Sequence, residues 1–180
     1  MLWNENQKLA WKDFRGKPVP SASFVASTNT GISFQYSYSI KNGAVHVEYS
    51  VESFFNPEGS WYIPERVNAH ILRHEQAHFD ISELHARMLR KNLHGKKFTK
   101  RIKSEIEGIY KQVEQKRRAM QTRFDAETDH SRNEEKEAFW QHYIAKQLAD
   151  YESWKSSTSN YDKYKLKYYK GLGTSSAQEA

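Results

Sequence analysis

The N-terminal third of the chain alternates apolar and polar side chains, which is the period of a half-buried β-strand. The alternation is clearest over residues 32–40 and 45–51. Between them, Asn42 and Gly43 form a pair that is typical of a tight hairpin turn. Two shorter strands are expected, at residues 24–28 and 60–63. The pattern therefore predicts an N-terminal antiparallel β-sheet over about residues 1–63.

After this region the apolar positions recur every three or four residues, which is a helical period. Pro64 suits the first turn of a long helix, and Gly95 supplies its C-terminal stop. The run Ser104–Glu107 has the form of a capping box and predicts the start of a second helix. A third helix is expected over about residues 134–154, after a break near residues 129–131.

The order of these elements predicts an α+β fold in one domain over residues 1–156. Its β part covers about residues 1–63 and its helical part residues 64–156. The remaining segment, residues 157–180, alternates basic and aromatic side chains and is interpreted as a tail. An edge strand, a disordered end or a nucleic-acid contact are all compatible with that composition.

Composition narrows the picture further. Aromatic residues make up 14% of the 180 residues, so most of the chain is expected to fold. No apolar run is long enough to cross a bilayer, and no signal peptide is present at Met1. The protein is therefore expected either to be cytoplasmic or to have lost a targeting segment. Because the chain has no cysteine, any metal must be bound by His, Asp or Glu.

The net charge of +6 is concentrated in one stretch, Gly95–Arg123, which holds ten Lys or Arg against three Glu. Such a patch can attract nucleic acid or acidic partners. The simpler interpretation is the solvated face of a helix.

The first predicted helix contains the run His74-Glu75-Gln76-Ala77-His78. Two histidines four residues apart lie on one side of a helix, about 6 Å apart along its axis, so both can hold one metal ion. Glu75 then lies beside the open position of the metal, where it can accept a proton from a water molecule. This is the HExxH spacing of zinc metallopeptidases. The alternative is a buried helix whose histidines are merely solvated or hydrogen-bonded.

A catalytic zinc site usually has three protein ligands and one open position. Along the helix axis, His70 lies about 12 Å from His78 and His85 about 10.5 Å from it in the other direction, so neither can easily share an ion held between His74 and His78. The better source is the segment 124–131, which an antiparallel return of the next helix brings back toward the motif. Equal helical rises place Asp125 nearest, whereas the preference of zinc for imidazole favours His130, so both remain candidates.

Several stretches of the chain carry a resemblance to a known family, and together they extend to about Trp140. They are Leu9–Gly16, Ser60–Trp61, Leu72–Asp80 with Ala86–Arg87, and Phe124–His130 with Trp140. With these stretches the chain resembles bacterial proteins described as secreted zinc-dependent proteases, catalogued as a domain of unknown function among the zincin-like peptidases.

The last stretch is similar to the family pattern Tyr-Asp-x-x-Thr-x-His-Gly, which is followed by a Gln and a Trp. This chain departs from it at three positions: Phe124 replaces Tyr, Ser131 replaces Gly and Glu137 replaces Gln. None of these changes removes a proposed ligand, although Phe124 lacks a phenol that could assist catalysis.

The resemblance implies that His74, His78 and His130 bind Zn²⁺ and that Glu75 acts as the general base. It implies a zincin-like fold, with an antiparallel sheet, a long HExxH helix and two further helices. The protein would then be a zinc metalloendopeptidase acting on peptide or protein substrates, secreted or periplasmic by family resemblance. Asp80 would either orient a ligand imidazole or lie on the surface.

Two alternatives from other classes stay open. A zinc-binding protein that performs no chemistry would close its coordination sphere with Asp125 or Glu127. A nucleic-acid-binding module would use the basic stretch and the tail, and its affinity would fall steeply with salt.

Overall fold

The computed structural model describes residues 1–19 and 23–156, and it confirms the α+β class. Residues 157–180, for which a tail was predicted, lie outside the described residues. The strands and helices are β1 (Ala26–Ser27), β2 (Thr30–Lys41), β3 (Ala44–Phe55), β4 (Trp61–Tyr62), α1 (Ala69–Leu93), α2 (Ile102–Thr128) and α3 (Glu134–Asp150).

The strands form two separate antiparallel sheets rather than the single sheet that was predicted. The long strands β2 and β3 pair along their whole length, from Thr30 opposite Phe55 to Lys41 opposite Ala44. Asn42 and its neighbour Gly43 both have positive φ angles, as a two-residue hairpin turn requires. The short strands β1 and β4 pair only with each other, so the region divides into a hairpin and a small ribbon.

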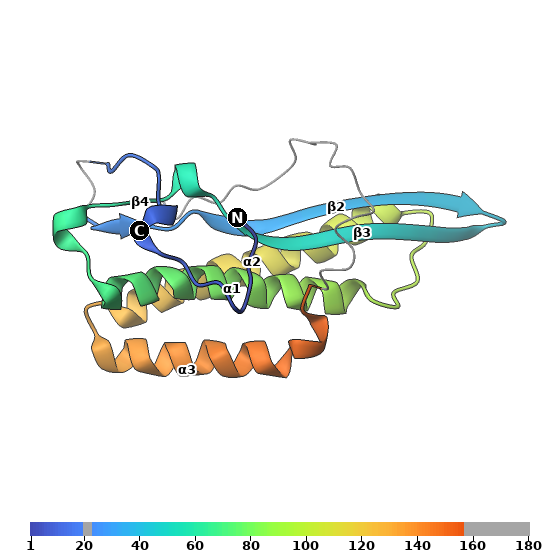
Figure 1. The fold of residues 1–180 in the computed structure, drawn as a ribbon. Helices are drawn as coiled ribbons and strands as arrows, with labels where there is room; N and C mark the ends of the chain where they lie inside the picture. The colour runs from blue at the N-terminus through green and yellow to red at the C-terminus, as the bar shows by residue number, and fades with distance from the viewer. Residues whose placement is uncertain (20–22, 157–180) are drawn as a thin grey trace.

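The elements stack in three layers (Figure 1). The β2–β3 hairpin lies along α1 and α2, its turn extends past the ends of the helices, and α3 lies on the opposite side of α1. Phe34 of β2 stacks on Tyr110 of α2, with ring centroids 5.3 Å apart. The main apolar core lies between the hairpin and the two helices, and its buried residues are Ile32, Val51, Ala86, Leu89, Leu93, Ile102, Ile106 and Val113.

Two helix starts differ from the prediction. Residues Pro64–Arg66 form a separate 3-10 turn, and α1 begins only after Asn68, whose side chain accepts a hydrogen bond from the Ile71 backbone N–H. Helix α2 begins at Ile102, before the predicted capping box. The capping contacts there come from the carboxylate of Glu105, which accepts from the backbone N–H and the hydroxyl of Thr99.

The N-terminal segment is tied to α1 and to the β4 region. The backbone N–H of Leu9 donates to the side chain of Gln76 at 2.8 Å. The backbone N–H of Gly16 donates to the carbonyl of Ser60 at 2.7 Å, and a Cβ at Gly16 would come within 2.8 Å of that same oxygen. Glycine is therefore needed for this close approach, which joins two of the stretches that carried the family resemblance.

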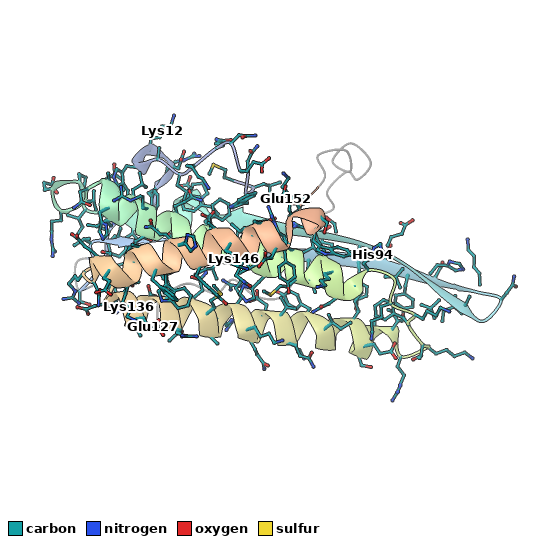
Figure 2. All side chains as sticks on the ribbon, turned by 90° about the horizontal axis from the view of Figure 1, so that it is seen from below. Lys12, His94, Glu127, Lys136, Lys146 and Glu152 are labelled. Carbon is teal, nitrogen blue, oxygen red and sulfur yellow. The ribbon has the colours of Figure 1, made fainter. Side chains whose placement is uncertain are left out.

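Figure 2 views the molecule from the helical side and shows Glu127 and Lys136 together at one end of the helices. His94 and Glu152 lie toward the other end. At the first end α2 and α3 are joined by a hydrogen bond from the Trp140 indole to Glu127, at 2.8 Å. No helix within the described part of the chain is both long enough and apolar enough to cross a bilayer.

Candidate metal centre

The two motif histidines lie on the buried side of α1. His74 and His78 expose only 4% and 6% of their surface, and their Nε2 atoms are 3.3 Å apart. The planes of the two rings meet at 85°, so the two nitrogens converge on one point although the rings do not stack.

Helix α2 runs back past α1 and brings a third donor to the same point. Asp125 Oδ1 lies 3.2 Å from Nε2 of His74 and 3.0 Å from Nε2 of His78. Beside it in the sequence, the fully buried Phe124 stacks on the His74 ring, with centroids 4.5 Å apart. Phe124 therefore packs beneath the imidazoles, and it is not among the residues that line the adjoining cavity.

The other nitrogen of each ring is held by an acceptor from a different helix. His74 Nδ1 lies 2.9 Å from the carboxylate of Glu137 on α3, so this nitrogen carries the proton and donates. His78 Nδ1 faces the side-chain oxygen of Gln121, whose amide nitrogen donates to the His78 carbonyl. Both rings therefore direct the lone pair of Nε2 to the shared point, as in metal sites whose histidines are oriented by hydrogen bonds.

The three converging atoms fit a tetrahedral zinc ion. Zinc bonds of about 2.0 to 2.1 Å place neighbouring ligand atoms about 3.4 Å apart. The observed separations of 3.0, 3.2 and 3.3 Å are close to the edges of one face of such a tetrahedron. Two lone pairs and a carboxylate oxygen repel one another unless a cation lies among them. Among the described residues, His74, His78 and Asp125 are the group of donors that could hold a metal ion.

The pKa shifts of His74, His78 and Asp125 show that positive charge is stabilised at this point. Burial lowers the pKa of His74, but hydrogen bonds to Asp125 and Glu137 outweigh it and raise the pKa to about 9. Burial also lowers the pKa of His78, and the charge of Asp125 more than reverses the effect. Burial raises the pKa of Asp125, but the neighbouring imidazoles hold it well below its usual value. A proton or a metal ion can supply this charge.

Glu75 lies next to the cluster and is held in place by β1. The hydroxyl of Thr28, directly after β1, donates to the Glu75 carboxylate at 2.6 Å. Both residues line a cavity of about 740 Å³ that is also lined by His74, His78 and Asp125. A buried carboxylate beside the donor set, with room for a ligand in front of it, has the position of a general base.

His130 lies at the edge of this cluster. Its ring is about one-third exposed, its Nδ1 is 4.0 Å from Asp125 Oδ1, and it packs on Phe24 at 4.8 Å between centroids. Helix α2 ends at Thr128, so His130 stands in the turn that follows it. Asp129, His130 and Ser131 all have positive φ angles, from 47° to 72°. The family pattern has glycine at the position of Ser131, where this left-handed backbone favours it.

Two residues with expected roles near the metal have other partners. Asp80 accepts hydrogen bonds from the Trp3 indole at 2.6 Å and from Gln76 at 2.8 Å, so it fastens the N-terminal segment rather than a ligand imidazole. Glu127 is bound by Arg123 and by Trp140, at 2.6 and 2.8 Å, and is not part of the donor cluster.

The two remaining histidines of α1 contact backbone carbonyl groups. His70 Nε2 lies 2.7 Å from the Ser131 carbonyl and supports the turn around His130. His85 is buried, and its Nδ1 lies 2.8 Å from the Ile81 carbonyl one turn earlier.

Three supporting residues were missed by sequence reasoning. Thr28 reaches the site from the residue after β1, Gln121 from α2 and Glu137 from α3, across 47, 43 and 63 residues of sequence. A signal existed for Glu137, because it stands where the family pattern has an amide that can accept the same hydrogen bond. Thr28 and Gln121 carried no signal.

Most of the chain matches a known protein family. Residues 8–131 match the family described as "Bacterial protein of unknown function (DUF922)". The chain therefore belongs to this family of bacterial proteins of unknown function. Glu137 and Trp140 lie beyond the matched residues, yet Glu137 orients His74 and Trp140 packs on Phe124.

The C-terminal part of the chain matches a different family. Residues 130–180 match the family described as "C-terminal associated domain of TOPRIM". The chain is 50% identical over 50 residues to DNA topoisomerase 2-alpha from Homo sapiens, which is 28% of this chain and 3% of that protein. With the same protein from Gallus gallus the identity is 61% over 33 residues, 18% of this chain and 2% of the relative. The chain thus spans about 3% or less of the length of these relatives. No solved structure matches it.

Proposed function

We propose that the protein is a zincin-like zinc metallopeptidase that hydrolyses peptide bonds in the cavity beside His74 and His78. The observation that carries the proposal is the convergence of two imidazole Nε2 atoms and the Asp125 carboxylate at tetrahedral spacing, with Glu75 alongside. Membership of a bacterial family and the HExxH spacing support it. Secretion or a periplasmic location, by family resemblance, is part of the same proposal.

Each group of the site has a separate role in the proposed hydrolysis. A bound zinc ion supplies Lewis acidity and lowers the pKa of a water molecule toward neutrality. Glu75 accepts the proton of the attacking water and passes it to the leaving amine. Thr28 holds the Glu75 carboxylate in the cavity through the 2.6 Å hydrogen bond. Glu137 and Gln121 hold the imidazoles in the tautomer that directs Nε2 at the ion.

The third zinc ligand is either Asp125 or His130. The spacing of Asp125 supports a ligand role, whereas the family resemblance supports His130, whose nitrogen is 4.0 Å from the same carboxylate oxygen. Zinc content of the variants Asp125→Ala and His130→Ala separates the two, because loss of a ligand lowers zinc affinity far more than loss of a neighbour does.

Glu75→Gln tests the reaction itself. We expect this variant to retain one zinc per chain by elemental analysis. We expect it to lose about 10³-fold in cleavage of a proteome-derived peptide library, because the amide cannot accept the proton. Thr28→Val is the matched variant, since it keeps the base but frees it, and a smaller loss is expected. Unchanged turnover in Glu75→Gln would exclude the mechanism.

A zinc protein without activity is the alternative within the same site. It predicts full zinc occupancy together with no cleavage anywhere in the library by the wild-type chain.

A second candidate function is nucleic-acid binding. It is favoured by the likeness of residues 130–180 to part of DNA topoisomerase 2-alpha and by the basic residues of α2. Fluorescence anisotropy with duplex and single-stranded DNA tests it. Affinity that falls steeply with salt and persists in a chelator would support it.

A further inference from the structure

We propose that the cavity selects peptides with acidic side chains near the scissile bond, and that Arg66 and Arg118 determine this specificity. The inference rests on the proposed function and names the class of substrate.

Arginines enter the cavity wall from several elements. Arg66 comes from the 3-10 turn before α1, Arg117 and Arg118 from α2, and Arg132 from the turn before α3. The acidic residues of the lining are Glu75 and Asp125. Both belong to the proposed catalytic centre, where the charge of the metal ion compensates theirs.

Three of these arginines have acidic neighbours, at different distances. Glu114 pairs with the buried Arg117 at 2.7 Å and reaches Arg118 at 3.7 Å, so one carboxylate lies between two guanidinium groups. Arg132 pairs with Asp129 at 3.2 Å. Arg118 is the more distant neighbour of Glu114, and its side chain is 58% exposed, so its guanidinium group is accessible to a ligand.

Arg66 differs from the other three arginines of the cavity wall. Within residues 1–19 and 23–156 no carboxylate forms an ion pair with it, and the neighbouring Glu65 does not line the cavity. Two exposed guanidinium groups, Arg118 from α2 and Arg66 from the turn before α1, would give the cavity a positive surface with the metal bound. Charge of one sign in a concave site attracts ligands of the opposite sign, and guanidinium groups pair with carboxylates in bidentate geometry.

The test separates binding from cleavage. Acetylated hexapeptides that differ only in carrying two Glu, two Gln or two Lys are titrated against the zinc-loaded Glu75→Gln variant by calorimetry. The same titrations are made with Arg66→Gln, Arg118→Gln and both changes added in that background. Arg101→Gln is the control, because this exposed arginine caps α2 and does not line the cavity. Cleavage of a proteome-derived peptide library by the wild-type chain is followed in parallel by mass spectrometry.

We expect the Glu peptide to bind about tenfold more tightly than the Gln peptide, and the Lys peptide to bind most weakly. Each single substitution reduces the ratio, the double substitution brings it below about twofold, and the control leaves it unchanged. Equal binding of all three peptides, or a ratio that survives the double substitution, would overturn the proposal.

The substrate specificity and the peptidase activity can be disproved separately. Library cleavage without enrichment of Glu or Asp near the cut bonds overturns the specificity and leaves the peptidase standing. Charge-selective binding that depends on Arg66 and Arg118, with no cleavage by the wild-type chain, supports the specificity and removes the peptidase.

Discussion

The two halves of α1 both bury histidines, yet they stabilise opposite charge states. Hydrogen bonds to two carboxylates overcome burial at His74 and raise its pKa to about 9. Burial lowers the pKa of His85 to about 4 and the charge of Arg117 lowers it further, whereas the hydrogen bond to the Ile81 carbonyl and the charge of Glu114 oppose this only in part. The difference lies in the partners, since both side chains are almost fully buried.

The buried acidic residues differ in the same way. In the C-terminal half of α1, Glu83 pairs with Arg87 at 2.9 Å and with Arg90 at 3.1 Å, so the cluster supplies its own counter-charge. Beside the N-terminal half, Asp125 of α2 and Glu137 of α3 lie against imidazoles, and the neutral amide of Gln141 also donates to Glu137. A buried polar cluster that balances its own charges serves the fold, whereas one that lacks a cation is suited to bind one.

The largest expected effect breaks the balanced half. Arg87→Met removes bonds to Glu83, to the Leu148 carbonyl and to Glu152, and leaves a buried carboxylate with one partner fewer. We expect a loss of about 3 kcal/mol in the free energy of unfolding, measured in urea, with zinc affinity unchanged. A loss below about 1 kcal/mol would show that the cluster is not structural.

The matching change in the other half is Asp125→Asn. We expect zinc binding to weaken by more than about 100-fold, equivalent to more than about 2.8 kcal/mol, in competition with a chromogenic chelator. The metal-free variant should unfold at nearly the wild-type urea concentration, because its histidines can become neutral. At the same zinc concentration, zinc should also raise the Tm of the wild-type chain more than that of the variant. A wild-type Tm that does not respond to zinc would contradict the comparison.

The pH dependence of stability tests whether His85 is neutral in the folded chain, in contrast to His74. Its pKa of about 4 in the folded chain lies below the ordinary 6.5, so the unfolded chain binds more protons. Stability from this residue is therefore complete above about pH 6.5 and is lost as the pH falls toward 4. We expect His85→Met to remove about 2 kcal/mol of the wild-type decrease between pH 8 and pH 5, in urea titrations. Parallel pH profiles for the two proteins would contradict this assignment.

The smallest effect concerns the turn beside the cavity. Ser131 has a φ angle of 72°, which costs a residue with a Cβ about 1 to 2 kcal/mol. Ser131→Gly should stabilise the chain by about 0.5 to 1 kcal/mol, less than the strain itself because glycine loses more entropy on folding. Ser104→Gly inside α2 is the control and should destabilise by about 0.5 kcal/mol. Stabilisation by both changes would point to a general effect of glycine and not to strain at Ser131.

Local sequence was enough to predict several parts of this protein. The hairpin turn at Asn42 and Gly43 follows from backbone preferences, and the pairing of His74 with His78 follows from the helical repeat. The antiparallel return that places Asp125 beside His74 follows from the equal rise of two helices joined by a short loop. The first two depend on neighbours within a few turns of chain, and the third depends on two regular helices and the short loop between them.

Tertiary structure alone decided the rest. The division of the strands into two sheets depends on which backbone groups β1 and β4 find free, and no local preference fixes that choice. The orientation of His74 and His78 depends on Glu137 and Gln121, which reach them across 63 and 43 residues. Whether a buried histidine is charged, neutral or ready to bind a metal depends on the groups packed around it. Those groups come together only when the distant parts of the chain have folded against one another.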